Sequence, residues 1–545
     1  MNSTTTGGHG SSTFQNISLV KGKLTFMSIL VPFVTCVVLW YVLGYVASPL
    51  RKYPGPPLAA WTNLWRMYHA HGGSFHLVIK KLHDKYGPVV RVGPNHLDLD
   101  CPSLIKTCFS GSSSWNKTRF YNVASALVDG EIMYSIFSET DNAKHSHMKR
   151  PVAKYYTMKG VLELQAHVDY VLALFVRKLD ESLVGARGAE RTIDFGKWIE
   201  FLSWDMLGQI TFGKPLGYLD HGYDHDQILS VNNKVMDYFA VVGMQPELDK
   251  FLDKNRIYRI GPPSFGAIVN LSLRYITSRY KGEDKHNMAM PDFLDRFIEA
   301  KMRHPDVVDN KRLLSYLLIQ ITAGADSVAV TLRSVFYLSL KHPPVWSRLQ
   351  SEILAAPFTQ QESMSLPATF SQARKIPYLE AVVREALRLY PVDCFPLERY
   401  VPTGGVNMPD GSFVPEGVAA GFNAYILHRN KEVWGLDADA FRPERWLRDE
   451  KNSETEEGYK RRLTEMNNCD LSFGDGNRKC IGINLGLMEV YKTVATLVAM
   501  YEFELADPEQ EWKIHNSIFP RQSGVHMRMR RRAGLSIPGA WEVTE

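Results

Sequence analysis

The ten residues FGDGNRKCIG, at positions 473–482, decide how the rest of this chain is interpreted. They place one cysteine, Cys480, among three glycines and two basic side chains, directly before an apolar segment. A loop this polar and flexible does not bury a thiol for packing, because connecting segments run over the surface. Cys480 is therefore either incidental or chemically active, and the other segments of the chain have to distinguish these alternatives.

The composition limits the class of protein. A chain of 545 residues exceeds the size of about 250–300 residues at which a single core stops growing, so one very large domain or two are expected. Hydrophobic residues make up 45% and charged residues 22%, which are ordinary globular values. A net charge of +5 is too small for a nucleic-acid binder that depends on dense basic patches. Six cysteines lack the density and spacing of a disulfide framework or a zinc site, which indicates a reducing, cytosolic main body.

The N-terminal segment predicts a membrane anchor. After a polar leader, residues 1–23, the stretch 24–47 contains no charged side chain and could span about 36 Å as a helix. A cleaved signal peptide is the alternative, but its apolar region is usually only about 7–15 residues long. A stiff, proline-rich hinge at 48–58 cannot continue the helix and is expected to lift the globular domain, residues 59–545, off the membrane.

The globular domain is predicted to be mainly α-helical with small β-sheets. Residues 85–99, KYGPVVRVGPNHLDL, predict a β-hairpin because two β-branched runs flank Gly-Pro-Asn. Most of 145–350 has a helical pattern, and residues 400–422 predict short strands and tight turns. Residues 451–462 predict a solvated loop.

One predicted helix, residues 313–340, is apolar on nearly every face around its middle, which is typical of a buried helix. Its centre nevertheless holds Gly324, a residue that costs about 1 kcal/mol relative to alanine in a helix. Asp326 and Ser327 follow, and such polar groups are expensive to bury without partners. The pattern indicates a functional site. The alternative is a kinked helix whose carboxylate is satisfied by a neighbouring backbone group.

Two further fragments are uninformative when taken singly. Residues 377–391, PYLEAVVREALRLYP, predict an amphipathic helix on which Glu385 and Arg388, three positions apart, can pair. Residues 441–446, FRPERW, place Arg445 in a proline-bounded loop. Each alone is typical of a solvated surface element.

Together these fragments resemble the cytochrome P-450 superfamily, the haem-thiolate monooxygenases, from about residue 24 to about residue 532. Glu385, Arg388 and Arg445 match an ion network that, by resemblance, is buried and holds the haem loop in place. AGADS, residues 323–327, matches the family's oxygen-binding stretch. Regional similarity favours fungal microsomal members of secondary metabolism, the pisatin demethylase-like group. The haem-binding loop matches at every defining position, through Phe473, Gly476, Arg478, Cys480 and Gly482.

The resemblance implies that Cys480 binds the iron of haem b as a thiolate, which pushes electron density into the metal and favours O–O cleavage. The N-terminus of the helix that follows, together with Arg478 and its neighbour Lys479, is expected to keep the sulfur deprotonated. Gly476 and Gly482 let the backbone turn tightly and approach the sulfur. Phe473 is expected to pack near the sulfur and limit water.

The resemblance also implies that cationic side chains hold the haem propionates. Arg399 and Arg478 are expected in this role, as are His145 and Lys149, which share one face of a predicted helix because they are four positions apart. His145 and Lys149 stand where many relatives carry tryptophan and arginine or histidine. The alternative for this helix is a solvated basic face.

On the other side of the haem, the resemblance gives Asp326 and Ser327 the role of a proton relay to dioxygen, while Ala323 and Gly324 leave space over the iron. Most relatives carry threonine where this chain has Ser327. Serine keeps the hydroxyl but loses the methyl group that restricts its rotamer. We therefore expect an intact relay with looser coupling, or a specialised oxidation.

The implied activity is insertion of one oxygen atom from O2 into a hydrophobic small-molecule metabolite, by hydroxylation, epoxidation or oxidative demethylation, in a fungal secondary-metabolite pathway. Electrons would come from an NADPH-dependent flavoprotein reductase. The protein is expected in the endoplasmic reticulum membrane, with a single span and a cytosolic catalytic domain. A haem-thiolate isomerase or dehydratase that needs no reductase, and a non-catalytic haem-binding sensor, are the alternatives; the Asp326–Ser327 relay argues against both.

Family analogy also predicts the segments that line the substrate pocket. Most of their residues are apolar, and Asp393 and Cys394 are the unusual polar ones. The substrate itself and the position that is oxidised are not written in the sequence. The expected segments are 115–127, helical parts of 230–275, 320–325, 391–397 and 517–520.

Overall fold

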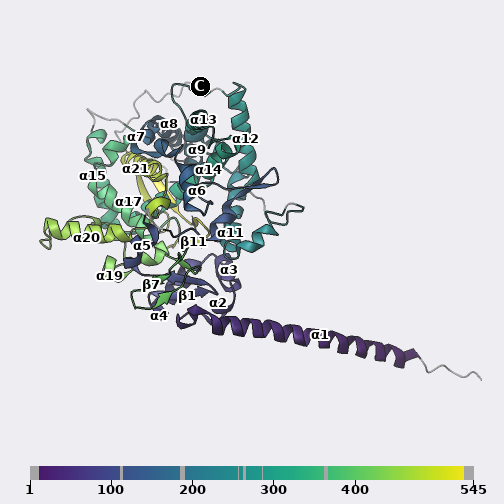
Figure 1. Ribbon diagram of the computed structural model, residues 1–545. Coiled ribbons are helices and arrows are strands. Elements are labelled where there is room, and N and C mark those ends of the chain that lie inside the picture. Colours follow the sequence, from purple (N-terminus) through teal and green to yellow (C-terminus); the bar gives the residue numbers. More distant parts are fainter. Residues whose placement is uncertain are drawn as a thin grey trace, which may run out of the picture.

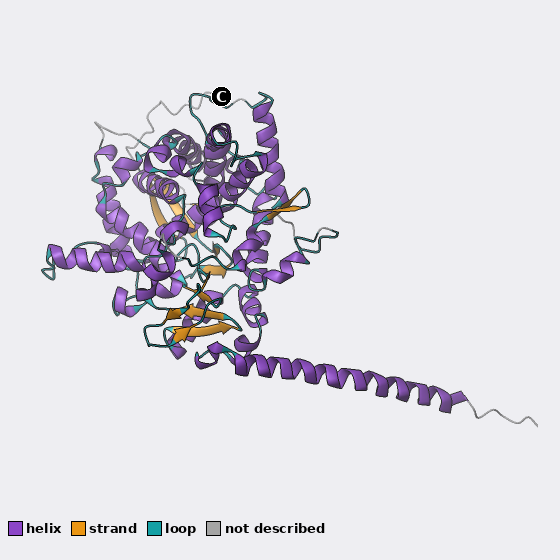
Figure 2. Ribbon diagram, in the orientation of Figure 1, coloured by secondary structure: helices purple, strands orange, loops and turns teal. Residues whose placement is uncertain are grey.

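Helices predominate in the computed structural model, and strands form only small sheets (Figure 2), which confirms the expected fold class. The structure describes residues 11–532 apart from 111–113, 184–190, 256, 262–264, 285 and 361–365.

The helices follow one another along the whole described chain. In chain order they are α1 (Ser11–Ala47), α2 (Pro57–Trp61), α3 (Leu64–His71), α4 (Phe75–Tyr86), α5 (Ile105–Phe109), α6 (Asn142–Lys149), α7 (Met158–Leu162), α8 (Gln165–Lys178), α9 (Phe195–Phe212), α10 (Tyr218–His221), α11 (Ile228–Val242), α12 (Gly266–Tyr280), α13 (Phe293–Arg303), α14 (Asn310–Lys341), α15 (Pro343–Leu354), α16 (Phe370–Ala373), α17 (Pro377–Leu389), α18 (Ala424–Leu427), α19 (Lys431–Trp434), α20 (Glu456–Cys469) and α21 (Ile483–Met500).

The strands are short and pair into separate sheets. One sheet has the order β1-β2-β9-β6 and another the order β10-β13-β5, while β11-β12, β3-β4 and β7-β8 are two-stranded. The strands are β1 (Val89–Gly93), β2 (His96–Leu99), β3 (Ala126–Val128), β4 (Glu131–Met133), β5 (Arg191–Asp194), β6 (Arg399–Tyr400), β7 (Val406–Asn407), β8 (Phe413–Val414), β9 (Ala419–Gly421), β10 (Tyr501–Leu505), β11 (Lys513–Asn516), β12 (Pro520–Ser523) and β13 (His526–Arg531).

Two sequence predictions about strands are confirmed. The expected hairpin is β1 and β2, which pair antiparallel with Val89 opposite Leu99. The expected strands of 400–422 are β6 to β9, and β9 joins the hairpin by pairing parallel to β2.

The predicted loop at 451–462 is wrong from residue 456 onward, because α20 begins there. Thr455 caps this helix by accepting a hydrogen bond from the Gly458 N–H at 3.1 Å, and two glutamates occupy its first turn. Threonine caps and acidic residues both stabilise a helix N-terminus. The polar composition that suggested a loop therefore belongs to a helix, which projects from the body at the left of Figure 1.

Helix α1 extends away from the globular body (Figure 1) and is a candidate membrane anchor. Its window Leu30–Ala47 has a mean hydropathy of 2.1, and none of it is buried. Helices α14 and α21 are also long and apolar enough to cross a membrane, but 72% and 78% of their windows are buried. We therefore assign α14 and α21 to the protein core. Residues 1–10 of the predicted leader lie outside the described residues.

The predicted hinge packs against the globular body through Arg91 on β1. The Arg91 backbone N–H donates to the Pro54 carbonyl at 2.7 Å, and its buried guanidinium donates to Ser48 Oγ at 3.0 Å and to the Ala60 carbonyl at 3.2 Å. A Cβ at Gly55 would lie 2.1 Å from the Arg91 carbonyl oxygen, so only glycine fits this contact. The hinge is thus part of the packed structure.

The long helix predicted at 313–340 is α14, which runs through the core against α9, α17 and α21. The Asp309 side chain caps it by accepting a hydrogen bond from the Arg312 N–H at 2.7 Å. Helix α14 carries Asp326 and Ser327, α17 carries Glu385, and α21 follows Cys480. This packing gathers the predicted site residues from distant parts of the chain.

Candidate active site

The Cys480 loop connects α20 to α21 and folds back on itself. The Cys480 N–H donates to the Phe473 carbonyl at 2.9 Å. Gly476 has a φ of +64°, a left-handed conformation that L side chains rarely adopt, and a Cβ there would lie 1.3 Å from the Phe109 carbonyl oxygen on α5. At Gly482 a Cβ would meet Cys480 Sγ at 3.8 Å, an ordinary contact. The protein alone therefore requires glycine at position 476 but not at position 482.

The Cys480 side chain keeps an exposed surface, but the protein around its sulfur still excludes much of the solvent. This burial raises the pKa of the thiol above its ordinary value, against the opposing effects of the Gly482 N–H and the charges of Lys149 and Lys479. The expected contribution of Arg478 to this balance is absent, and Lys149 takes its place. The thiol is thus protonated at neutral pH, and binding a metal ion would release its proton.

Arg478 reaches across to the first residue of α6 and to the residues that precede it. Its guanidinium donates to Asn142 Oδ1 at 2.8 Å and to the carbonyls of Glu139 and Thr140 at 2.7 and 3.0 Å. Burial and the charge of Arg399 lower the pKa of Arg478 to about 10. Arg478 therefore ties the Cys480 loop to α6, and its contact with a propionate stays a prediction.

Arg399 lies beside Lys117. Sequence reasoning did not identify Lys117 as a site residue. An antiparallel backbone bridge joins the two residues, and both side chains are buried. Lys117 Nζ donates to the Phe137 carbonyl at 2.8 Å and lies 4.1 Å from the ring centroid of Tyr121. Burial, then the charges of Arg399 and Arg478, hold the pKa of Lys117 well below its ordinary value. Its position in the mostly apolar stretch 115–127 was the available signal.

Helix α6 adds His145 and Lys149, which lie one turn apart as predicted. His145 is buried and its Nδ1 has no hydrogen-bond partner. Burial and the charges of Arg478 and Lys117 lower the pKa of His145 to about 3, so it is neutral. Because it is buried among cations, His145 does not belong to a solvated basic face. We refer to Lys117, His145, Lys149, Arg399 and Arg478 as the cationic cluster.

The middle of α14 places a hydroxyl and a carboxyl side by side in sequence but with separate partners. Ser327 Oγ donates to the Ala323 carbonyl at 2.8 Å, one turn earlier. A Cβ at Gly324 would lie 2.7 Å from Leu207 Cδ1, while the space that this glycine is expected to leave over the iron stays a prediction. The glycine therefore makes room for α9, because its bare face is directed at that helix.

The Asp326 carboxyl is held by two neutral donors that sequence reasoning missed. Trp204 Nε1 of α9 donates to Oδ1 at 2.8 Å, and Asn232 Nδ2 of α11 donates to Oδ2 at 2.8 Å. Burial raises the pKa of Asp326 to about 6, and the charge of Glu200 adds to this effect, while the Trp204 hydrogen bond opposes it. The alternative, in which a neighbouring backbone group satisfies the carboxylate, is wrong because both of these donors are side chains. Asp326 can exchange a proton near neutral pH.

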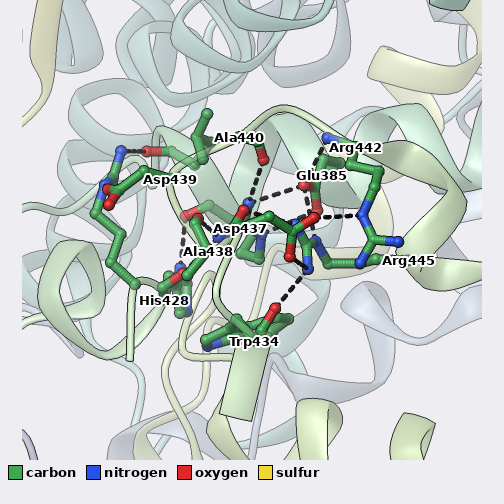
Figure 3. Close-up of polar contacts among 12 residues, drawn as sticks. Glu385, His428, Trp434, Asp437, Ala438, Asp439, Ala440, Arg442 and Arg445 are labelled. Carbon is green, nitrogen blue, oxygen red and sulfur yellow. Dashed lines mark hydrogen bonds and ion pairs between the residues drawn. The ribbon is translucent and has the colours of Figure 1, made fainter. Parts of the chain in front are cut away.

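Glu385, Arg388 and Arg445 form a fully buried ion network, and Figure 3 labels Glu385 and Arg445 within it. Arg388 donates to both Glu385 oxygens at 2.9 and 2.8 Å, and Arg445 Nε donates to one of them at 3.0 Å. The Arg442 N–H and Trp446 Nε1 add bonds at 3.0 and 2.9 Å. Although burial alone would raise it, the pKa of Glu385 stays below its ordinary value because of Arg388 and Arg445. Glu385 is therefore charged in this network, and both of its carboxylate oxygens accept hydrogen bonds.

His428 connects this network to the Cys480 loop, a link that sequence reasoning missed. Its Nε2 accepts a hydrogen bond from the Leu471 N–H at 2.9 Å, so the ring proton sits on Nδ1 and is donated to the Arg388 carbonyl at 2.9 Å. Arg388 in turn donates to the His428 carbonyl at 2.5 Å. Burial lowers the pKa of His428 to about 4, which keeps the ring neutral.

Three of the segments predicted to line a substrate pocket meet at Phe120. Its ring centroid lies 4.9 Å from that of Phe239 on α11 and 6.2 Å from that of Phe395 in the stretch 391–397. Of the two unusual polar residues there, buried Cys394 donates its thiol to the Pro391 carbonyl at 3.2 Å. Burial raises the pKa of Asp393 to about 6, against the Phe395 N–H and the nearby charges of Lys117 and Arg399.

Comparison with known proteins decides the family. The family model "Cytochrome P-450" matches residues 54–527. Cytochrome P-450 monooxygenase cfoH of Aspergillus candidus is 52% identical over 515 residues, which cover 94% of each chain. This chain belongs to the cytochrome P-450 family. Monooxygenases cicH and pkfB of Emericella nidulans are 32% and 31% identical, and the matches cover 89% and 93% of this chain and 95% and 97% of theirs.

Cytochromes P-450 are oxidoreductases that bind haem b through an axial cysteine thiolate, and the residues of this chain fit that group. The cationic cluster gathers basic side chains, buried or half-buried, and their charges help to depress the pKa values of Lys117, His145 and Arg478. Such an arrangement is unfavourable unless an anion accompanies it, because buried charges are normally paired. The two propionates of haem b are anions of this kind, and the Nδ1 atom of His145 still lacks a partner.

Proposed function

We propose that this chain is a membrane-anchored haem-thiolate monooxygenase that inserts one oxygen atom of O2 into a hydrophobic small-molecule metabolite. The observation that carries the proposal is the Cys480 loop, in which Gly476 admits no side chain and Lys149 favours the thiolate. A thiolate ligand pushes electron density into haem iron and favours O–O cleavage. A cysteine fixed in this way suits iron ligation better than packing.

In this proposal Cys480 is the iron ligand, and Phe473, Gly476 and Gly482 shape the loop around its sulfur. The cationic cluster holds the propionates, with Lys117 added to the residues expected from the sequence. The network of Glu385, Arg388 and Arg445 holds the loop in place through His428. These roles divide the site into ligation, charge neutralisation and support.

Asp326 and Ser327 act in this proposal as the proton relay. The raised pKa of Asp326, about 6, supports this role, because an acid that titrates near the working pH can both give and take up a proton. Ser327 presents its hydroxyl from the same stretch while its proton is shared with the Ala323 carbonyl. Ala323 and Gly324 keep this part of α14 free of larger side chains.

The proposed electron donor is an NADPH-dependent flavoprotein reductase, and the proposed location is the endoplasmic reticulum membrane, with one span and a cytosolic catalytic domain. The unburied apolar helix α1 supports an anchor. The aromatic contacts of Phe120 support a hydrophobic substrate. The fungal relatives named as monooxygenases support a monooxygenation. The reaction is proposed to be a hydroxylation, epoxidation or oxidative demethylation in secondary metabolism, as in the pisatin demethylase-like group. An isomerase would need neither a reductase nor the relay, so reductase-dependent NADPH consumption distinguishes the two activities.

The deciding experiment tests thiolate ligation. The reduced holoprotein with carbon monoxide should show the red-shifted Soret band of a thiolate-bound haem, and Cys480→Ser should abolish it. Cys36→Ser is the matched control, because Cys36 lies on the unburied part of α1 and should leave the spectrum unchanged. A thiolate-type band in Cys480→Ser would contradict the assignment.

A further inference from the structure

Two side chains from different helices converge on the carboxyl of Asp326. Trp204 on α9 and Asn232 on α11 are both buried, and each donates one hydrogen bond of 2.8 Å to a different carboxyl oxygen. Neither residue belongs to a haem contact or to the ion network described above. We propose that Trp204 and Asn232 are positioning residues that fix the orientation of Asp326 and let it change its protonation state without moving.

The neutral character of both donors matters for proton exchange. A cation at hydrogen-bond distance would lower the pKa of a carboxyl by about 1–3 units and trap it as a carboxylate. An indole N–H and an amide N–H stabilise the carboxylate less, because they carry no net charge. Burial therefore dominates and holds the pKa of Asp326 at about 6.

The charged groups around Asp326 have partners of their own. Arg333 of α14 pairs with Glu200 of α9 at 3.3 Å, and Arg521 of β12 pairs with Asp237 of α11 at 2.8 Å. His515 of β11 also contacts Asp237, at 3.1 Å. Within the part of the chain that the structure describes, no ion pair reaches Asp326. These pairs set a background field, and Trp204 and Asn232 make the direct contacts.

Asn232 is suited to both protonation states of Asp326. Its Oδ1 is buried and has no hydrogen-bond partner. A rotation of the amide by half a turn would therefore break no other bond and would present an acceptor to a protonated carboxyl. Trp204 can only donate, so it stays on Oδ1 of Asp326 in both states. The carboxyl thus keeps two partners whether it holds a proton or not.

This arrangement deepens the proposed monooxygenase function and rests on it. Monooxygenation consumes one O2, two electrons and two protons for each oxygen atom inserted, and releases one water. A proton that leaves the Asp326 carboxyl is replaced from solvent, so the residue returns to its starting state. A carboxyl that is held in place while its proton exchanges can repeat this step in every cycle.

The test measures the titration of Asp326 in the holoprotein by infrared spectroscopy. The C=O band of its protonated carboxyl is assigned by its loss in Asp326→Asn. Trp204→Phe and Asn232→Leu each remove one stabilising donor of the carboxylate, so the midpoint should rise by about one pH unit from its wild-type value. Trp198→Phe on α9 and Asn233→Leu on α11 are matched controls, since neither side chain donates to Asp326, and they should leave the midpoint unchanged.

The same proteins are then compared for peroxide released per NADPH consumed with the flavoprotein reductase. Trp204→Phe and Asn232→Leu should release several-fold more peroxide than the controls while keeping the thiolate-type carbon monoxide spectrum. Wild-type midpoints and peroxide yields in both variants would overturn the positioning role and leave the proposed function intact. Loss of the thiolate-type spectrum in the wild type would instead overturn the proposed function.

Discussion

Gly476 determines how closely the Cys480 loop approaches α5. Its positive φ could be tolerated by other residues at a modest cost, but the 1.3 Å separation between a Cβ at this position and the Phe109 carbonyl oxygen could not. The neighbouring backbone would have to move, and the sulfur would move with it. This single position therefore constrains where the sulfur of Cys480, the proposed iron ligand, can lie.

We expect Gly476→Ala to lose haem incorporation, measured as the ratio of Soret to protein absorbance. Gly411→Ala is the control, because Gly411 also has a positive φ, +79°, but a Cβ there would meet no atom within 4 Å. The control should keep its haem and lose only about 1 kcal/mol of stability. Equal haem content in the two variants would show that the clash is relieved elsewhere.

Ser327 invites a test of its hydroxyl. Ser327→Ala removes the donor to the Ala323 carbonyl and should increase the peroxide released per NADPH several-fold. Ser327→Thr keeps the hydroxyl and restricts its rotamer, so it should release less peroxide than the wild type. Unchanged peroxide and product yields in Ser327→Ala would exclude a relay role.

The residues that sequence reasoning missed have a common physical cause. Trp204 and Asn232 lie 122 and 94 positions from Asp326, and Lys117 meets Arg399 only through a long-range backbone bridge. No local spacing connects such pairs, because the packing of helices and sheets brings them together. The Cys480 loop was predictable because its residues act within ten consecutive positions.

At the scale of elements, α17 and the Cys480 loop form one mechanical unit. Glu385 of α17 binds Arg388 and Arg445, and His428 links Arg388 to the Leu471 N–H ahead of the loop. The spacing of Glu385 and Arg388 predicted their pairing. It could not predict the role of His428. The neutral ring accepts a hydrogen bond from one backbone segment, at Leu471, and donates one to another, at Arg388.

Glu385→Ala should lower the free energy of unfolding by about 3–5 kcal/mol, because it leaves two buried arginines without their carboxylate. Chemical denaturation and haem content measure the effect. Glu380→Ala on the same helix is the control, since its contact with Arg374 is 3.8 Å and partly exposed, and such pairs contribute at most about 1 kcal/mol. Normal haem content in Glu385→Ala would contradict a supporting role for the network.

The neutral state of His428 predicts how the stability of the folded protein changes at acidic pH. Its pKa is lowered to about 4 in the folded protein, below the ordinary value of about 6.5 expected when unfolded. The unfolded state therefore binds the proton first, and this contribution to stability is lost as pH falls from about 6.5 towards 4. When the pH is lowered from 7 to 5, the free energy of unfolding should fall by about 2 kcal/mol less in His428→Asn than in the wild type. Denaturation experiments at the two pH values measure this difference. An identical pH dependence would mean that other groups dominate.

At the scale of the whole molecule, the sequence was sufficient for the fold class and for the apolar N-terminal helix, but not for the packing of the hinge. Its prolines indicated a stiff spacer, whereas the structure packs the segment against β1 through Arg91. The composition of a linker predicts its stiffness, but it does not predict which surface of the protein the linker packs against. The same limit explains why the charged stretch that becomes α20 resembled a loop.

Removal of residues 1–47 should release the protein from membranes and keep the thiolate-type carbon monoxide spectrum. Removal of residues 1–58 should also destabilise it, because Arg91 then loses its bonds to Ser48 and Pro54. Membrane sedimentation and thermal unfolding of the two shortened chains measure these effects. Equal unfolding temperatures would show that the hinge contacts add nothing.

If α1 anchors the protein as proposed, the contacts of Arg91 also bear on how it meets proteins of the same membrane. They join the end of α1, the hinge and the first sheet, which favours one orientation of the globular body relative to α1. In a bilayer its tilt would be preset. An electron donor embedded in the same membrane would then diffuse in two dimensions towards a partner that always presents the same face. Fewer of its collisions would occur in an unproductive orientation.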